Sequence, residues 1–168
     1  MRHILAAIAV STAFALGGCD DRKEHSDIKV TNDDGTTVTI KSHDGKVVVQ
    51  SDDRKTVFRS ATGEGAIEVK TPDFVPVYPG AKVQTMSSTS TDGGKGGMMI
   101  FYSDAAPKQI VAFYKKKAAS EGFKETMNME ASGTLMFSAS DESSKTGMNV
   151  VVREDGGKTM TQVMWSEK

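Results

Sequence analysis

Short runs of β-branched residues alternate with polar turn signals in the first half of the chain. The turn signals recur about every ten residues, and two of them are Asp34-Gly35 and Asp44-Gly45. An Asp-Gly pair between two alternating runs is a strong signal for a β-hairpin. The pattern therefore predicts an antiparallel meander of five short strands at residues 28–31, 36–40, 47–49, 56–58 and 66–69.

The meander has one apolar face and one polar face, because side chains alternate between the two sides of a strand. We expect the polar face to carry Lys29, Thr37, Thr39 and Glu68. The apolar face should carry Ile28, Val30, Val38, Ile40, Val47, Val49, Ile67 and Val69. With about one pair of apolar residues per strand, the meander needs to pack on something else to be stable.

A different pattern begins after Pro72, Pro76 and Pro79, which mark a boundary at residues 71–80. Beyond it, an apolar stripe at helical spacing runs from Ile110 to Ala118. Ser103 or Asp104 can cap the start of this helix, Pro107 suits its first turn, and Gly122 ends it. Strands are expected at residues 83–86, 98–102, 123–129, 134–139, 148–153 and 159–165.

These elements predict an α+β fold that is mostly β. An N-terminal antiparallel β-meander, residues 28–70, precedes an antiparallel sheet of order β-β-α-β-β-β-β with one helix packed on a face, residues 81–168. The motif Tyr78-Pro79-Gly80-Ala81, the Phe113-Tyr114-Lys115 helix and Gly122-Phe123 together resemble a small α+β domain of bacterial envelope proteins. That resemblance implies a compartment and an architecture, but no activity.

The N-terminus has the features of a signal peptide. A positive start, Met1-Arg2-His3, precedes an uncharged apolar stretch at residues 4–16 that is shorter than a membrane-spanning helix. Leu16-Gly17-Gly18-Cys19 then resembles the lipobox of bacterial lipoproteins. The resemblance implies removal of residues 1–18 and a covalent lipid on Cys19, followed by a polar tether at residues 19–27.

Asp20 directly follows the cysteine. In lipoproteins of the enterobacterial type, an aspartate at this position retains the protein in the inner membrane. The resemblance therefore implies a lipid-anchored protein on the periplasmic side of the cell membrane, with the inner membrane favoured over the outer.

Composition argues against several classes of function. The 168 residues carry 21 Lys and Arg against 22 Asp and Glu, whereas nucleic-acid binders usually have a basic excess. Lys115, Lys116 and Lys117 spread around the helix and are expected to be solvated. The single cysteine is assigned to lipid, and His25 and His43 lie in a tether and a turn. We therefore expect no enzyme, no catalytic residue and no cofactor besides the lipid.

Methionine is the unusual residue of the second half, which contains nine after residue 80. We expect most of them to fill irregular packing between sheet and helix. Thioethers also bind Cu(I), and Met127-Asn128-Met129 offers the one close pair for such a metal site. A methionine-lined groove for a hydrophobic partner is a further alternative.

The sequence thus favours a membrane-anchored lipoprotein that acts as a non-enzymatic interaction or structural module of the envelope, with an envelope protein as a possible partner. Two alternatives stay open: a methionine-based binder of copper or a small ligand, and a hydrolase with an unrecognised site.

Overall fold

The computed structural model describes residues 26–31, 35–43, 46–51, 56–62 and 70–168. The predicted leader, with Cys19 and Asp20, and the predicted strand at 66–69 lie outside these residues.

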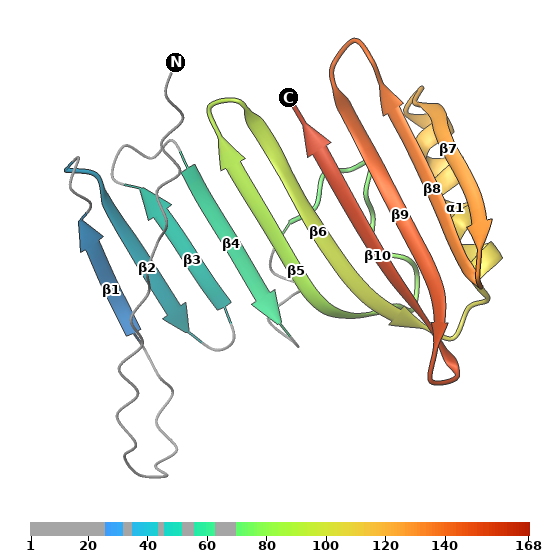
Figure 1. Cartoon of the computed structure of the whole chain (residues 1–168), viewed down its shortest axis with the longest axis horizontal. Coiled ribbons are helices and arrows are strands. Elements are labelled where there is room, and N and C mark those ends of the chain that lie inside the picture. Colours follow the sequence, from blue (N-terminus) through green and yellow to red (C-terminus); the bar gives the residue numbers. More distant parts are fainter. Residues whose placement is uncertain (1–25, 32–34, 44–45, 52–55, 63–69) are drawn as a thin grey trace.

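One antiparallel sheet of ten strands dominates the molecule, in the order β1-β2-β3-β4-β5-β6-β10-β9-β8-β7 (Figure 1). Its strands are β1 (Ser26–Thr31), β2 (Thr37–His43), β3 (Lys46–Ser51), β4 (Thr56–Thr62), β5 (Lys82–Thr91), β6 (Gly94–Ser103), β7 (Lys124–Ala131), β8 (Thr134–Asp141), β9 (Thr146–Asp155) and β10 (Lys158–Glu167). The single described helix, α1 (Pro107–Ser120), follows β6. This arrangement confirms the predicted α+β class, mostly β, with one helix on a sheet face.

The meander and the second half of the chain form the same sheet. β4 pairs antiparallel with β5, from Thr56 opposite Thr91 to Thr62 opposite Thr85. The meander therefore gains backbone hydrogen bonds along the edge of a larger sheet. The predicted division of the chain at residues 71–80 stays a prediction.

Helix α1 begins differently from the expectation. The residue before its first turn is Ala106, whose backbone N–H donates to Gln109 Oε1 at 3.1 Å. Ser103 instead accepts a hydrogen bond from the N–H of Ala105 at 3.0 Å, one turn too early to cap the helix. Pro107 occupies the first turn as predicted, and Gly122, with φ of 77°, ends the helix.

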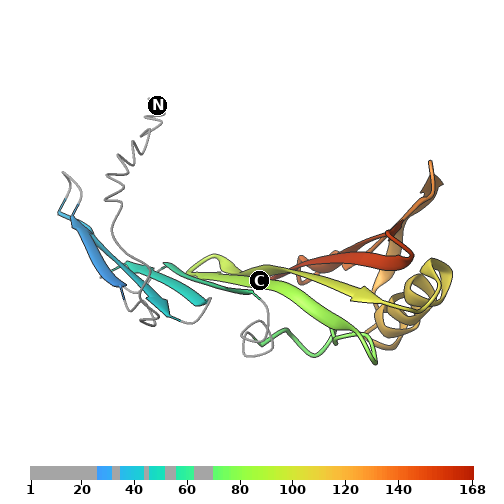
Figure 2. The same cartoon turned by 90° about the horizontal axis from the view of Figure 1, so that it is seen from below.

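Helix α1 and residues 70–81 cover the same side of the sheet, which we call the covered face (Figure 2). Tyr114 of α1 donates a hydrogen bond to the carbonyl oxygen of Pro76. Tyr78 stacks on Phe101 of β6 and meets the edge of Phe113 in α1. These aromatic contacts fasten the proline-rich segment between the helix and the sheet.

The hydrophobic core lies between the covered face and these two segments. Its largest fully buried side chains include Tyr114, Phe101, Phe137, Met99 and Met86. On β10, Thr159, Thr161, Val163 and Trp165 are buried while the residues between them are half-buried or exposed. This alternation shows that the sheet presents one dry side and one side facing away from the core.

Strands β1–β3 lack such a core. Every side chain described in them is half-buried or exposed, and Ile28 and Val30 of β1 are 51% and 46% exposed. In β4, Ala61 is the one described residue that is fully buried. This part of the sheet is a single layer, whereas stable domains are built from two packed layers.

Candidate functional site: the open face of the sheet

The side of the sheet opposite α1, which we call the open face, extends across all ten strands and has no charged residue in its central rows. Residues directly opposite each other on antiparallel strands share a face. Ile28, Ile40, Val49 and Phe58 form one such row. The register confirms the predicted shared face for the apolar residues of β1–β3, whereas Ile67 and Val69 lie outside the described residues. Ile100, Gln162, Val151, Met136 and Met129 form another row at the far end of the sheet.

Between these two apolar ends lies a strip of small polar residues. On β4 and β5 the open face presents Ser60, Ser87 and Thr89, and on β6 it presents Gly96. The strip therefore adds neither charge nor large side chains to the middle of the open face.

The methionines divide between the two faces. Met86, Met99 and Met148 are buried at 1%, 0% and 4% exposure on the covered face, as packing predicts. The register places the other six on the open face, namely Met98, Met127, Met129, Met136, Met160 and Met164. Core packing is therefore the right explanation for three of the nine and the wrong one for six.

Two groups of thioethers lie on the open face. Met129 of β7 stands directly opposite Met136 of β8, and Met127 precedes it by two residues on the same face. Met98 of β6 stands opposite Met164 of β10, and Gln162 donates from Nε2 to the Met98 sulfur at 3.1 Å. Met129 and Met164 are 45% and 38% exposed, so both groups are accessible from solvent.

Charged residues of the open face lie toward the ends of the strands, Lys124 at one end and the others at the opposite end. Tyr102 donates its hydroxyl hydrogen to Asp155 at 2.8 Å, and this hydrogen bond raises the pKa of Tyr102 above its ordinary value. Lys158 stands opposite Asp155, and Arg153 contacts the sulfur of Met160 at 3.7 Å. The centre of the open face is left without an ionised group.

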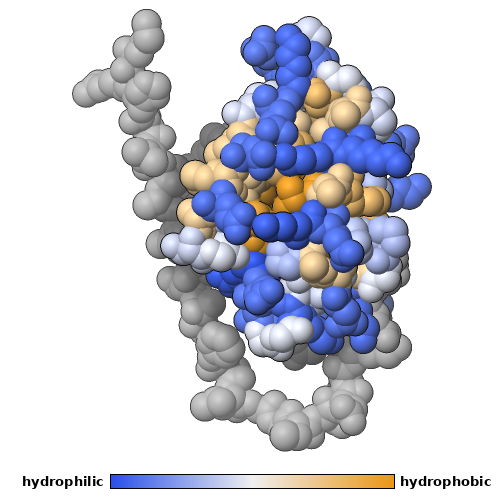
Figure 3. All heavy atoms as spheres, turned by 90° about the vertical axis from the view of Figure 1, so that its right-hand side faces the viewer, coloured by the Kyte–Doolittle hydropathy of each residue, from blue (hydrophilic) through white to orange (hydrophobic). Residues whose placement is uncertain are grey.

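The edge between α1 and β7 is closed by ion pairs. Lys115 lies 3.3 Å from Glu125 and 5.6 Å from the centre of the Phe137 ring, and Lys108 lies 4.0 Å from Glu130. Figure 3 shows this end of the molecule, where hydrophilic side chains cross an apolar area. These long cationic side chains cover apolar surface while their charged ends stay in water.

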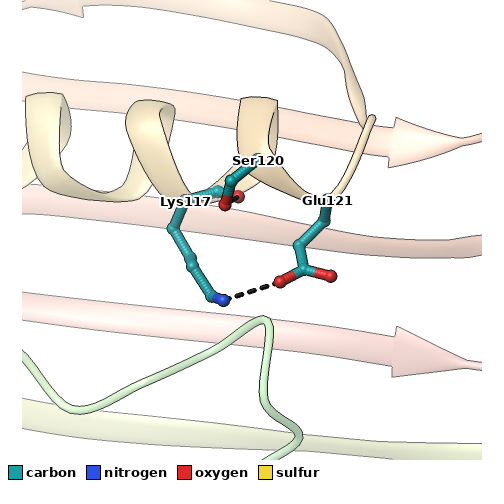
Figure 4. A network of polar contacts seen from close by, with 3 residues as sticks. All are labelled: Lys117, Ser120 and Glu121. Carbon is teal, nitrogen blue, oxygen red and sulfur yellow. Dashed lines mark hydrogen bonds and ion pairs between the residues drawn. The ribbon is translucent and has the colours of Figure 1, made fainter.

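The three consecutive lysines of α1 are used locally. Lys117 pairs with Glu121 at 2.6 Å, next to Ser120, whose hydroxyl donates to the Lys117 carbonyl (Figure 4). Lys115 pairs across to β7, and Lys116 is exposed. The prediction of a solvated surface therefore holds for Lys116, whereas Lys115 and Lys117 are half-buried and ion-paired.

Solvent-open hollows lie along the sheet, including two that are lined by charged residues. One, of about 730 Å³ near the start of α1, contains Lys108 and Arg153 together with Glu130 and Glu154. The other, of about 310 Å³, lies beside Trp165 and contains Arg59, Lys70, Lys95 and Glu167. The first hollow has balanced charge, and the second has an excess of cations.

The sequence-predicted site residues fall in different places. Met127 and Met129 lie on the open face, and His43 is exposed on β2. Cys19 and Asp20 are outside the described residues. Within those residues, no three His, Cys, Asp or Glu side chains are placed to hold a metal ion. No helix in the described part of the chain is long and apolar enough to cross a membrane.

Sequence reasoning missed Ile100, Val151 and Gln162 as surface residues. Ile100 and Val151 lie beside buried residues in apolar runs, and Gln162 lies between the buried Thr161 and Val163, so composition alone does not separate them from the core. Side chains alternate between the two faces of a strand, so a residue next to a buried one points to the opposite face. This alternation is the signal that could have identified them.

Comparisons with known proteins give one similarity. A family model described as START domain-like matches residues 83–157, from β5 to the turn before β10, and includes α1. The match spans less than half of the 168 residues. No curated protein and no solved structure matches the chain. The family has a different description from the envelope domain that the Tyr78–Ala81 motif resembles, and that second resemblance stays a prediction.

Proposed function

We propose that this protein is a lipid-anchored, non-enzymatic interaction module of the bacterial envelope, and that the open face is its interaction surface. The observation that carries the proposal is the extent of this face, which runs uncharged through its centre across ten strands. Single exposed apolar residues are ordinary, but larger apolar patches, such as those at the two ends of this face, typically mark sites of interaction.

The START-like similarity supports a binding role, because it suggests a domain that binds a ligand. The covered face offers little room for one, since Tyr114, Phe101, Phe137 and Met99 fill the space between helix and sheet with less than 2% exposure each. The open face combines free area with side chains that adapt to different partners. Methionine suits such a surface because it is flexible and polarisable.

The proposed anchor limits where the partner can be. Seven residue steps separate Cys19 from Ser26, the first residue of β1. A fully extended chain spans about 3.5 Å per residue, so β1 would lie within about 24 Å of the lipid. A membrane-attached partner, or one held close to the membrane surface, fits this reach.

Metabolic labelling with a radioactive fatty acid tests the anchor. We expect the wild-type chain to incorporate label and to sediment with membranes, and Cys19→Ser to lose both properties. Asp20→Ser should shift the labelled protein toward the outer membrane fraction. An unlabelled wild-type chain, or label retained by Cys19→Ser, contradicts the lipoprotein assignment.

In-cell photocrosslinking tests the interaction surface. A photoreactive phenylalanine analogue replaces Met164 on the open face, and the matched control replaces Lys116, an exposed residue of α1. We expect a discrete crosslinked species from position 164 and none from position 116. The same yield from both positions, or no species from position 164, rejects the open face as the interaction surface.

A second candidate function is Cu(I) binding, because three thioethers of Met127, Met129 and Met136 lie on one face of a hairpin. Soft sulfur ligands select Cu(I) over harder cations. Titration of the full chain with Cu(I) should then give one site that weakens at least tenfold in Met129→Leu and is unchanged in Met86→Leu, a buried residue of the covered face. Affinity no better than millimolar, or equal loss in both variants, rejects this function.

A further inference from the structure

We infer that the occupant of the open face is the open face of a second copy of this chain, packed sheet against sheet around a two-fold axis. The inference rests on the proposed function of that face as an interaction surface. It adds the identity of the partner and the geometry of the contact.

The distribution of charge favours a second copy. A two-fold interface presents the same patch from both sides, so any charge near the axis meets its own like charge. The centre of the open face has no ionised residue, and Lys82, the open-face cation of β5, lies at the end of that strand opposite Tyr102. In β1–β4, the cations Lys29, Lys41 and Arg59 all lie on the opposite side of the sheet. Serine, threonine, glycine and methionine can face their own copies without repulsion.

The part of the sheet that forms a single layer indicates how the two copies are oriented relative to each other. β5 and β6 are at the middle of the strand order. The strands β10, β8 and β7, which carry methionines on the open face, lie on one side of them, and β1–β4, which lack a second layer, lie on the other. A two-fold axis that runs along β5 and β6 places the methionines of each copy over the valines and isoleucines of its partner. Flexible thioethers then fill the surface above β-branched side chains, and β1–β4 obtain a second layer.

The available area suits a stable dimer. Strands in a sheet are about 4.8 Å apart and rise about 3.3 Å per residue, so ten strands that contribute about six residues each present roughly 900 Å². Stable interfaces bury about 800 Å² on each partner. Packed sheets lie about 10 Å apart, which brings residues of β5 close to their own copies near the axis.

Cysteine crosslinking in intact cells tests the contact with the full chain. Ser87 and Ser88 are consecutive half-buried residues at the middle of β5, and they point to the open and the covered face respectively. With a short thiol-to-thiol crosslinker, we expect Ser87→Cys to give a covalent dimer at least tenfold more abundant than Ser88→Cys gives. Cys19 is present in both variants, so it does not contribute to the difference.

A charge substitution gives an independent measurement on the detergent-solubilised full chain. We expect light scattering to give a protein mass of two chains for the wild type and for Ser88→Glu, and of one chain for Ser87→Glu, with unchanged circular dichroism in all three. A wild-type mass of one chain at tens of micromolar, or equal crosslinking at positions 87 and 88, overturns the inference. A crosslink from position 87 to a different protein also overturns it, but leaves the proposed function standing.

Discussion

Tyr114 of α1 donates its hydroxyl hydrogen to the carbonyl oxygen of Pro76 over 2.9 Å, joining the helix to a segment 38 residues earlier in the chain. The ring is fully buried, and burial raises the pKa of the hydroxyl above its ordinary value of about 10. Together with the contacts of Tyr78, this hydrogen bond holds residues 70–81 against the helix.

Replacing Tyr114 by Phe removes the donor and leaves the Pro76 oxygen unsatisfied. We expect a loss of about 1–2 kcal/mol in the free energy of unfolding at pH 7, measured by urea denaturation. Above pH 10 the unfolded wild-type chain loses the Tyr114 proton while the folded chain retains it, so wild-type stability falls as pH rises. Tyr114→Phe should lose less stability between pH 9 and 11, and an identical alkaline loss contradicts the assignment.

Met98 and Met99 are neighbours on β6 that point to opposite faces, which makes them a direct test of the sheet's orientation. Met99 is fully buried, so Met99→Ala should lose about 2–5 kcal/mol of stability through the cavity it leaves. Met98→Ala, on the open face, should lose less than about 1 kcal/mol in the monomer. Equal losses in chemical denaturation would show that the faces are wrongly assigned.

Gly97 leaves room for the ring of Trp165 beside the backbone of β6. A Cβ at this position would collide with the Trp165 ring and the carbonyl oxygen of Ser87. We expect Gly97→Ala to lose about 1–3 kcal/mol and to change the tryptophan emission, because overpacking moves the ring. Gly93→Ala is the control, since its Cβ would meet only the Thr91 hydroxyl at an ordinary 3.7 Å.

Thr161 and Thr159 are buried on β10, but their hydroxyls differ. Thr159 Oγ1 donates to the carbonyl oxygen of Ala105 at 2.7 Å, whereas Thr161 Oγ1 has no hydrogen-bond partner among the described residues. Replacing Thr161 by Val should therefore raise the free energy of unfolding by about 1 kcal/mol, because a buried unsatisfied hydroxyl is unfavourable. Thr159→Val should lower it by a similar amount. A loss in both variants would show that Thr161 has a partner.

Much of the fold could be predicted from the sequence because its signals are local. The glycines that follow Ser132 and Asp155 mark hairpin turns, and strands lie on both sides of each turn as expected. The helix follows from the spacing of Ile110, Tyr114 and Ala118, all of which are buried. The sequence underestimated the length of β5 and β6, since Ser87–Thr91 and Gly94–Gly97 resemble loop in composition but are held in the sheet by backbone pairing.

The candidate site was harder to predict because it depends on pairing between distant segments. The register of β6 with β10 places Met98 opposite Met164, and no local pattern specifies that partner. The pairing of β4 with β5 crosses a long connection and creates the continuous open face. Ala106 could not be recognised as the residue before α1, because it lacks the side-chain oxygen that usually marks that position.

The uneven burial along the strand order has a mechanical consequence. Tension applied at Ser26 loads β1 first, whose side chains are the least buried, and each hairpin that detaches passes the load to the next strand. Strands β1–β4, which lack a second layer, would detach from the sheet one after another at low force. The part of the sheet that packs against α1 would unfold last and in one large step. Under tension the chain would therefore lengthen gradually before its core unfolds.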